Sequence, residues 1–319
     1  MAIISASRRT DIPTYFSRWF LNRLSDGSLM VRNPFNQEQV SEIELSKNVI
    51  DCIVFWTKNP LPMIPYLKEL NSYKIPYYFQ FTLTGYGRDI EANVPEKRLL
   101  IKAFKDLYIQ GNGHTIWRYE PIVFNKVYTP EYHLRAFNSI ASELRGYTDK
   151  CVISFVDIYP NNKDAIAKIG SRDMTHAELV DFCKKISMIA GENGMTVGTC
   201  AEVVNLDECG IVHNKCVDPD YIEKIIGMPI KAKKDGAQRK ECGCIESIDI
   251  GAYNTCKNGC KYCYACKDPK QLERNFASYD PNSPLLCDSL QGDETITKRK
   301  LTSMVDIKAY ERDMQTTLF

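Results

Sequence analysis

Several features that assign a protein to a class are missing from this sequence. No apolar run approaches the ~18 residues that a membrane-spanning helix needs, which argues against an integral membrane protein. The first nine residues have neither the basic start nor the long apolar stretch of a secretion signal, so we expect a cytoplasmic protein. Excess charge is also missing: 41 basic residues face 40 acidic ones, which argues against nucleic-acid binding driven by bulk charge.

Familiar catalytic motifs are missing as well. The chain has no Walker loop, no Gly-x-Ser-x-Gly and no His-Glu-x-x-His. Its 44% hydrophobic and 25% charged residues are typical of a globular protein, not of a disordered or collagen-like chain. At 319 residues it is long enough for two domains or for one α/β barrel.

Cysteine, in contrast, is abundant, with thirteen residues. In a reducing compartment, clustered cysteines more often bind metal or carry out redox chemistry than form disulfides. Scattered cysteines with apolar neighbours, such as Cys52 and Cys151, are better interpreted as small core residues. Nine cysteines lie within 67 residues: Cys200, Cys209, Cys216, Cys242, Cys244, Cys256, Cys260, Cys263 and Cys266.

Short apolar runs alternate with amphipathic stretches along the first two thirds of the chain. The runs predict strands buried on both faces, and the stretches predict crossover helices at Pro95–Gln110, Pro130–Leu144 and Thr175–Glu192. This rhythm predicts an α/β fold with a partial (β/α)6 TIM-like barrel over residues 1–202 and a Cys-rich extension over residues 203–319, packed on the barrel mouth. The six predicted strands are Ala2–Ser5, Cys52–Trp56, Tyr77–Leu83, His114–Tyr119, Cys151–Ile158 and Met195–Thr199.

Polar residues follow each predicted strand. In parallel α/β folds, binding and catalytic groups lie at the carboxyl ends of the strands, so these residues are candidates for a site. The plainer alternative is that Pro and Gly merely end strands and that Arg and Asp cap helices. The polar groups are Ser7–Pro13, Thr57–Pro60, Thr82–Gly87, Arg118–Pro121, Asp157 with Tyr159, and Cys200–Glu202.

The strongest chemical signal is the Cys-x3-Cys-x2-Cys spacing of Cys256, Cys260 and Cys263, with Tyr262 just before the third cysteine. Three thiolates this close in sequence can bind one face of an iron–sulfur cubane, and three ligands leave the fourth iron open. The same spacing also suits a structural zinc site. Cys266 lies three residues further on, and as a fourth ligand it would close the cluster.

This motif resembles the signature of the radical S-adenosylmethionine (SAM) superfamily. The resemblance implies a 4Fe–4S cluster whose open iron binds SAM, reductive cleavage of SAM to a 5′-deoxyadenosyl radical, and hydrogen abstraction from an unknown substrate. It also implies a reductant such as flavodoxin or ferredoxin. In that superfamily the motif normally follows the first strand, whereas here it follows the sixth, so it looks permuted.

The whole chain resembles an uncharacterised bacterial family of unknown function with this arrangement. Its Trp-Thr-Lys-Asn-Pro element is distantly similar to spore-photoproduct-lyase-like proteins. The shared elements are Ser7–Pro13, Phe55–Pro60, Asp249–Gly251, Tyr262–Ala265 and Ser283–Leu286.

A SAM site is expected where the strand ends meet the cysteine loop. Lys58 or Arg118 could pair with the SAM carboxylate, and Asp157 could bind the ribose hydroxyls. Thr57 belongs to the same expected site, as do Arg8 and Arg9, of which at most one should face the cavity. The sulfurs of the motif are accordingly expected beside the Ser7–Asp11 loop and Lys58.

A second group of cysteines, Cys200, Cys216, Cys242 and Cys244, precedes the motif. Four thiolates could bind zinc or an auxiliary cluster, with Cys209 and His213 as alternative ligands, or they could be independent core thiols. A rival function is therefore a non-catalytic zinc- or iron–sulfur-binding module. It could contact nucleic acid through the basic residues 231–240, although that stretch is also typical of a solvated loop.

Overall fold

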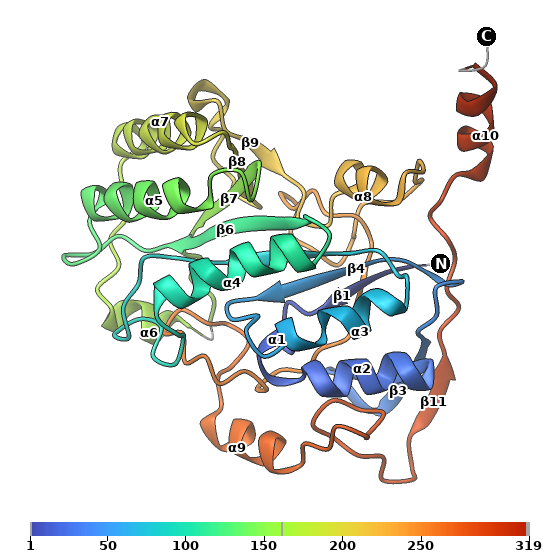
Figure 1. Ribbon diagram of the computed structural model, residues 1–319. Coiled ribbons are helices and arrows are strands. Elements are labelled where there is room, and N and C mark those ends of the chain that lie inside the picture. Colours follow the sequence, from blue (N-terminus) through green and yellow to red (C-terminus); the bar gives the residue numbers. More distant parts are fainter. Residues whose placement is uncertain (1, 161, 317–319) are drawn as a thin grey trace.

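The computed structural model describes residues 2–160 and 162–316, and for 313–316 it describes the backbone only. A parallel sheet of eight strands lies at its centre (Figure 1). The strand order is β10-β1-β4-β5-β6-β7-β8-β9, and every neighbouring pair is parallel. Among the described residues the two edge strands do not pair with each other, so the sheet does not close. The strands are β1 Ala2–Ala6, β4 Ile50–Thr57, β5 Tyr77–Thr82, β6 Thr115–Ile122, β7 Lys150–Phe155, β8 Thr196–Cys200, β9 Val212–Asn214 and β10 Ile248–Asp249.

All six predicted strands are confirmed, and so are the three predicted crossover helices α4 Lys97–Gln110, α5 Pro130–Leu144 and α7 His176–Glu192. The start of α7 is set by a capping box, in which the Thr175 hydroxyl accepts from the Glu178 N–H and the Glu178 carboxylate accepts from the Thr175 N–H. Strand β7 ends at Phe155, three residues earlier than predicted, which leaves Asp157 in the following loop.

A second, three-stranded sheet was not predicted. It has the order β11-β3-β2 and consists of β2 Ser28–Asn33, β3 Asn36–Glu44 and β11 Thr295–Lys298. Because β11 pairs with β3, and β9 and β10 extend the main sheet, residues after 202 contribute strands to both sheets. The division at residue 202 stays a prediction, and its outer limits, residues 1 and 319, lie outside the described residues.

The remaining helices are shorter or lie at the periphery. Helix α10 projects from the body of the molecule, at the upper right of Figure 1. They are α1 Ile12–Tyr15, α2 Ser17–Asp26, α3 Leu67–Ser72, α6 Lys163–Lys168, α8 Pro219–Ile226, α9 Pro269–Ala277 and α10 Ile307–Thr316, with 3₁₀ turns at Ile64–Tyr66 and Asp207–Cys209.

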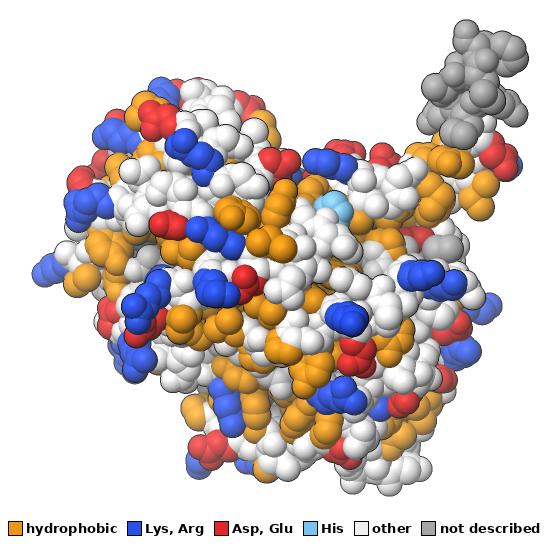
Figure 2. All heavy atoms as spheres, viewed as in Figure 1, with side chains coloured by type: hydrophobic (Ala, Val, Ile, Leu, Met, Phe, Trp, Pro, Cys, Tyr) orange, Lys and Arg blue, Asp and Glu red, His pale blue; other side chains and the backbone are white. Residues whose placement is uncertain are grey.

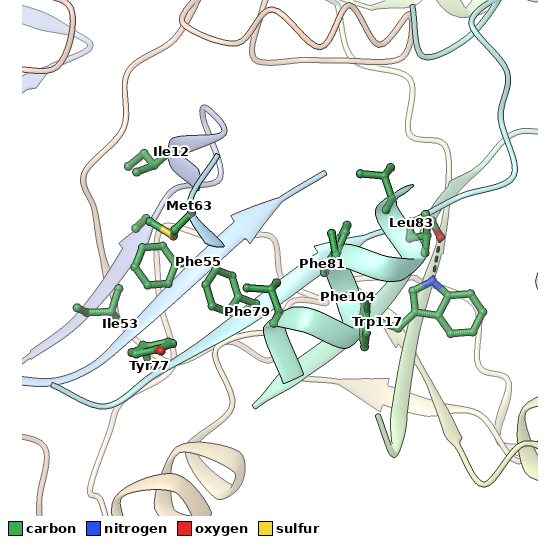
Figure 3. Packing of buried hydrophobic residues seen from close by; sticks show 14 of the residues in the cluster. Ile12, Ile53, Phe55, Met63, Tyr77, Phe79, Phe81, Leu83, Phe104 and Trp117 are labelled. Atoms are coloured by element: carbon green, nitrogen blue, oxygen red, sulfur yellow. Dashed lines mark hydrogen bonds between the residues drawn. The ribbon is translucent and has the colours of Figure 1, made fainter. Parts of the chain in front are cut away.

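One face of the main sheet carries the large apolar core. Alternate residues of successive strands, such as Phe55, Phe79 and Trp117, point toward the helices that cover this face (Figure 3). The Trp117 ring nitrogen donates to the Leu83 carbonyl at 2.8 Å, so the core satisfies its polar atom. Each such ring contributes roughly 2–3 kcal/mol by leaving water, which fixes the register of the strands that carry the site.

The intervening residues point to the opposite face, which carries Ser5, Trp56, Gln80, Arg118 and Cys200; we call it the cysteine face. Helix α8 and the cysteines of the following loop pack on it. Tyr78 and Gln80 both donate to the carbonyl of Cys216 at 2.7 Å, which fixes this segment to the sheet. The one-residue alternation of strands therefore separates an apolar face from a face with chemistry.

On the exterior, charges of both signs intermingle. The face in Figure 2 shows basic side chains interspersed with acidic ones, in keeping with the net charge of +1. Within residues 2–160 and 162–316, no helix combines the length and the apolar character needed to cross a membrane.

Candidate functional site

The loop with Cys256, Cys260 and Cys263 lies at the carboxyl ends of β1 and β4 and is fastened there by Asn258. The Asn258 side-chain amide donates to the Asp11 carboxylate at 3.1 Å and accepts from the Tyr15 hydroxyl at 2.8 Å. The Asn258 backbone carbonyl accepts from the Asn93 backbone N–H at 3.0 Å. Gly259 turns the loop with a φ of +66°, and a Cβ there would lie 3.2 Å from Ala92 and Asn93. The loop is therefore held from both sides.

The three thiols of this loop are neighbours of one another. Burial raises the pKa of Cys256 and Cys260, that of Cys260 to about 12. The charges of Cys260 and Cys263 add to the rise at Cys256, and that of Cys263 adds to the rise at Cys260. Lys58 acts in the opposite direction on Cys260, as a nearby cation does. Cys266 also lies close, because the backbone N–H of Cys256 donates to its sulfur. Without a metal these buried thiols are therefore held in the neutral form, and binding of a metal would have to displace their protons.

Asp11 is buried beneath the loop and joins it to two strands. Besides Asn258, its carboxylate accepts from the Thr57 hydroxyl and from the Lys58 N–H, both at 2.8 Å. Burial raises its pKa, although these bonds oppose the shift. The Thr57 hydroxyl, which was expected to bind SAM, thus supports Asp11 and also accepts from the Asn59 N–H at 3.0 Å.

Glu91 is the second buried carboxylate of the site. Its side chain is 1% exposed and accepts from Lys58 at 2.9 Å, from Lys97 at 2.6 Å and from the Tyr262 hydroxyl. Burial alone would raise its pKa, but the two ammonium groups lower it to about 2. The Lys58 ammonium also lies 5.4 Å from the centre of the Tyr262 ring. Sequence reasoning missed Glu91, because its partner Tyr262 is 171 residues away and no motif surrounds it.

Arg8 and Arg9 follow β1, and their side chains contact different aromatic rings. The Arg9 side chain lies 4.0 Å from Asp249 and 5.3 Å from the Tyr253 ring centre. Asp249 also accepts from the Arg8 N–H at 2.8 Å. Gly251 is required here, since a Cβ would come within 2.1 Å of the Ser7 hydroxyl.

Arg8 and Arg118 meet over one aromatic ring on the cysteine face. Their guanidinium carbons lie 4.8 and 5.0 Å from the centre of the Trp56 ring. Arg118 is 2% exposed, pairs with Glu120, and donates to the Gln80 amide oxygen at 3.0 Å. Both arginine side chains therefore lie on the cysteine face, whereas the Lys58 ammonium lies beside the three-cysteine loop.

The second group of cysteines converges on this face. Cys200 ends β8, Cys216 follows β9, and Cys242 and Cys244 belong to the loop before β10; all are free thiols. The sulfurs of Cys216 and Cys200 are 3.4 Å apart, and side-chain hydrogen bonds connect Cys216 with Cys244 and Cys244 with Cys242. The bond from Cys244 lowers the pKa of Cys242 to about 7.

Cys209 and His213, the alternative ligands, lie elsewhere. The Cys209 thiol donates to the Val180 carbonyl at 3.6 Å, and His213 bonds to the Thr199 hydroxyl at 3.3 Å. In the described part of the chain, no group of three or more His, Cys, Asp or Glu side chains is arranged to hold a metal ion.

A cavity of about 510 Å³ opens at the carboxyl ends of β6, β7 and β8. Its walls are mainly apolar, and its charged groups include Asp157, Glu202 and Arg239. Arg239 pairs with Asp157 at 2.5 Å, which takes up one of the basic residues of 231–240. Burial raises the pKa of Glu202 to about 7, while the Phe155 N–H donates to its carboxylate at 2.8 Å. A smaller hollow at the amino ends of β5 and β6 lies at the opposite edge of the sheet.

Comparison with known proteins shows distant structural likeness. A structure described as an α-L-fucosidase of Bacteroides thetaiotaomicron VPI-5482 is 12% identical, with a TM-score of 0.27 over 56% of this chain and 84% of that one. D-psicose 3-epimerase of Clostridium cellulolyticum H10 is also 12% identical, with a TM-score of 0.36 over 86% of this chain and 95% of that one. No curated protein matches the chain.

The family comparison covers both cysteine groups and ends one residue before Cys266. The model of one family, described as a domain of unknown function (DUF1848), matches residues 3–265. This range includes all the main-sheet strands except the first residue of β1, and the three-cysteine loop up to Cys263. The chain therefore belongs to the DUF1848 family.

Proposed function

We propose that this protein is a radical SAM enzyme whose cluster is held by Cys256, Cys260 and Cys263. The observation that carries the proposal is the meeting of three thiols, in a loop fastened by Asp11 and Tyr15, at the carboxyl edge of a parallel sheet. A cubane binds each thiolate to a different iron, so its ligands need not surround one point as those of a single ion do. The donor set thus fits such a cluster.

When bound, the cluster would supply the electron that cleaves SAM and the open iron that holds it. The chain's own residues would position this site. Lys58 has three N–H donors, and Glu91 is the one acceptor recorded for it within the described residues. The ammonium therefore keeps capacity to bind an anionic group such as the SAM carboxylate.

We assign the substrate to the cavity at the carboxyl ends of β6, β7 and β8, the same edge of the sheet as the three-cysteine loop. Its walls are mainly apolar, which would limit the water around a reactive radical. The charged groups at its rim, Asp157, Glu202 and Arg239, would orient a polar substrate or the SAM ribose. Arg8 and Arg118 are engaged on the cysteine face and Arg9 with Asp249, so in this proposal Lys58 is the principal SAM contact.

The direct test is the formation of 5′-deoxyadenosine by the anaerobically reconstituted, reduced protein. Cys256→Ala, Cys260→Ala and Cys263→Ala should each reduce it to background, because each removes a cluster ligand. Cys266→Ala is the matched control and should retain the activity. Loss of activity in folded Cys266→Ala would mean that four thiols close the cluster, and the proposal would fail.

A further inference from the structure

The four thiols of the cysteine face come together although the chain separates them. Cys200 and Cys216 lie on either side of β9, while Cys242 and Cys244 come from a loop more than twenty residues later. Three of the four residues, all except Cys200, are buried. Backbone atoms hold them in place: the Cys216 carbonyl accepts from Tyr78, and the Cys244 sulfur accepts from the Val217 N–H at 3.3 Å. Independent core thiols have no need of such convergence.

The surroundings of this group are cationic. The Arg118 guanidinium donates to the Cys216 sulfur at 2.9 Å, and Arg8 faces Cys244, Cys216 and Cys242 electrostatically. One buried nitrogen of Arg8, Nη2, finds no hydrogen-bond acceptor among the described residues. A buried donor without an acceptor is costly, and sulfur bound to a metal ion in this group would provide an acceptor.

The local charge count points the same way. Arg8, Arg9 and Arg118 are in contact with two carboxylates, Glu120 and Asp249, which leaves an excess of positive charge. Four thiolates around a divalent ion would form a dianionic centre. N–H···S bonds from arginine would then stabilise it, as second-layer donors do at metal sites.

The distance between the Cys200 and Cys216 sulfurs favours one ion over a cluster. Tetrahedral zinc with Zn–S bonds of ~2.3 Å places its sulfurs roughly 3.8 Å apart. The 3.4 Å between Cys200 and Cys216 is close to that value, whereas a cubane would spread its ligands further. We infer that Cys200, Cys216, Cys242 and Cys244 bind a single Zn²⁺, which replaces the four thiol protons and fixes the Cys242–Cys244 loop to the sheet. Small rotations of these side chains would close the site around the ion.

Metal analysis of the full chain tests this inference separately from the proposed function. The protein purified with zinc should contain one Zn²⁺ per chain, and the Cys256/Cys260/Cys263 triple alanine variant should contain the same amount. Replacement by Co²⁺ should give the intense thiolate-to-cobalt absorption of a tetrahedral four-sulfur site. Cys216→Ala should weaken retention of the ion strongly, and Cys183→Ala, a buried free thiol outside both groups, should not.

A second measurement does not depend on variants that fold. Zinc added to the reduced metal-free protein should protect four thiols from a thiol reagent, and a chelator should expose them again. An iron–sulfur spectrum in the triple variant, or no metal and no thiol protection, would overturn the inference. Either result would leave the assignment of the three-cysteine loop intact.

Discussion

The two groups of cysteines differ in how the chain assembles them. Cys256, Cys260 and Cys263 are contiguous in sequence, lie at the edge of the sheet, and are held by the polar groups Asp11 and Glu91. Cys200, Cys216, Cys242 and Cys244 are collected from three segments onto one face of the sheet, where their sulfurs touch. The first arrangement keeps its thiols available at the mouth of the fold. The second uses its thiols to fix a segment.

This difference indicates which of the two cysteine groups is suited to catalysis. A site with three protein ligands leaves a coordination position open, and four ligands close it. The three-cysteine loop has a cation beside it, Lys58, whereas the arginines of the cysteine face already have sulfur and aromatic partners. We therefore propose a catalytic role for the loop and a stabilising role for the cysteine face.

The largest expected effect is that a substitution in either cysteine group removes the metal of that group and leaves the other metal in place. Cys260→Ala should abolish iron–sulfur absorption and 5′-deoxyadenosine formation while leaving zinc in place. Cys216→Ala should lose zinc while retaining the ability to assemble iron. Metal analysis of both variants, with circular dichroism to verify folding, checks this. Loss of both metals in each variant would show that the two groups form one centre, and it would contradict the division into two independent groups.

The next effect concerns the carboxylate that fastens the three-cysteine loop. Glu91→Gln removes the charge between two ammonium groups and should lower the free energy of unfolding by about 3 kcal/mol. Glu96→Gln is the matched control, because Glu96 pairs with Arg98 at the exposed surface and should cost at most about 0.5 kcal/mol. Urea denaturation measures both. Equal stability of the two variants would contradict the role of Glu91.

Acid should weaken the same contact in a defined range. The folded pKa of Glu91 is about 2, below its ordinary value, so its contribution is present above about pH 4.5 and is lost as the pH falls toward 2. The stability difference between wild type and Glu91→Gln should therefore shrink by roughly 1 kcal/mol between pH 5.5 and pH 3.5. Because other carboxylates cancel in this difference, a constant gap would refute the assigned ion pairs.

The smallest effect lies far from both groups. Thr175→Ala removes the hydroxyl of the capping box of α7 and should cost about 1 kcal/mol in thermal or urea unfolding. Neither the zinc content nor SAM cleavage should change. A change in either would mean that global stability, rather than local ligation, controls the metal sites, and it would weaken the comparison.

Sequence predicted the elements that bury continuous apolar runs. The strands at Ile50–Thr57 and Tyr77–Thr82 are long and apolar, so their pattern alone was sufficient. The two- and three-residue strands β10 and β9 could not be predicted, because neighbouring strands supply their pairing. The β2–β3 hairpin was not predicted, although Asn33–Asn36 contains the Asn and Pro residues that are typical of a hairpin turn.

The candidate site was predictable only where it is local. The spacing of Cys256, Cys260 and Cys263 marks their loop at once. No pattern around Glu91 announces that it will meet Lys58 and Tyr262, since the sheet brings these residues together. For the same reason the engagement of Thr57 with Asp11 was not foreseen, and its proposed contact with SAM stays a prediction.

The central claim is that the three-cysteine loop leaves one iron open to SAM. Electron paramagnetic resonance of the reduced, anaerobically reconstituted protein, with and without SAM, tests it most directly, and Cys266→Ala provides the control. The account predicts that SAM changes the shape and g values of the cluster signal in both the wild type and Cys266→Ala. A cluster signal that is identical with and without SAM would contradict the account.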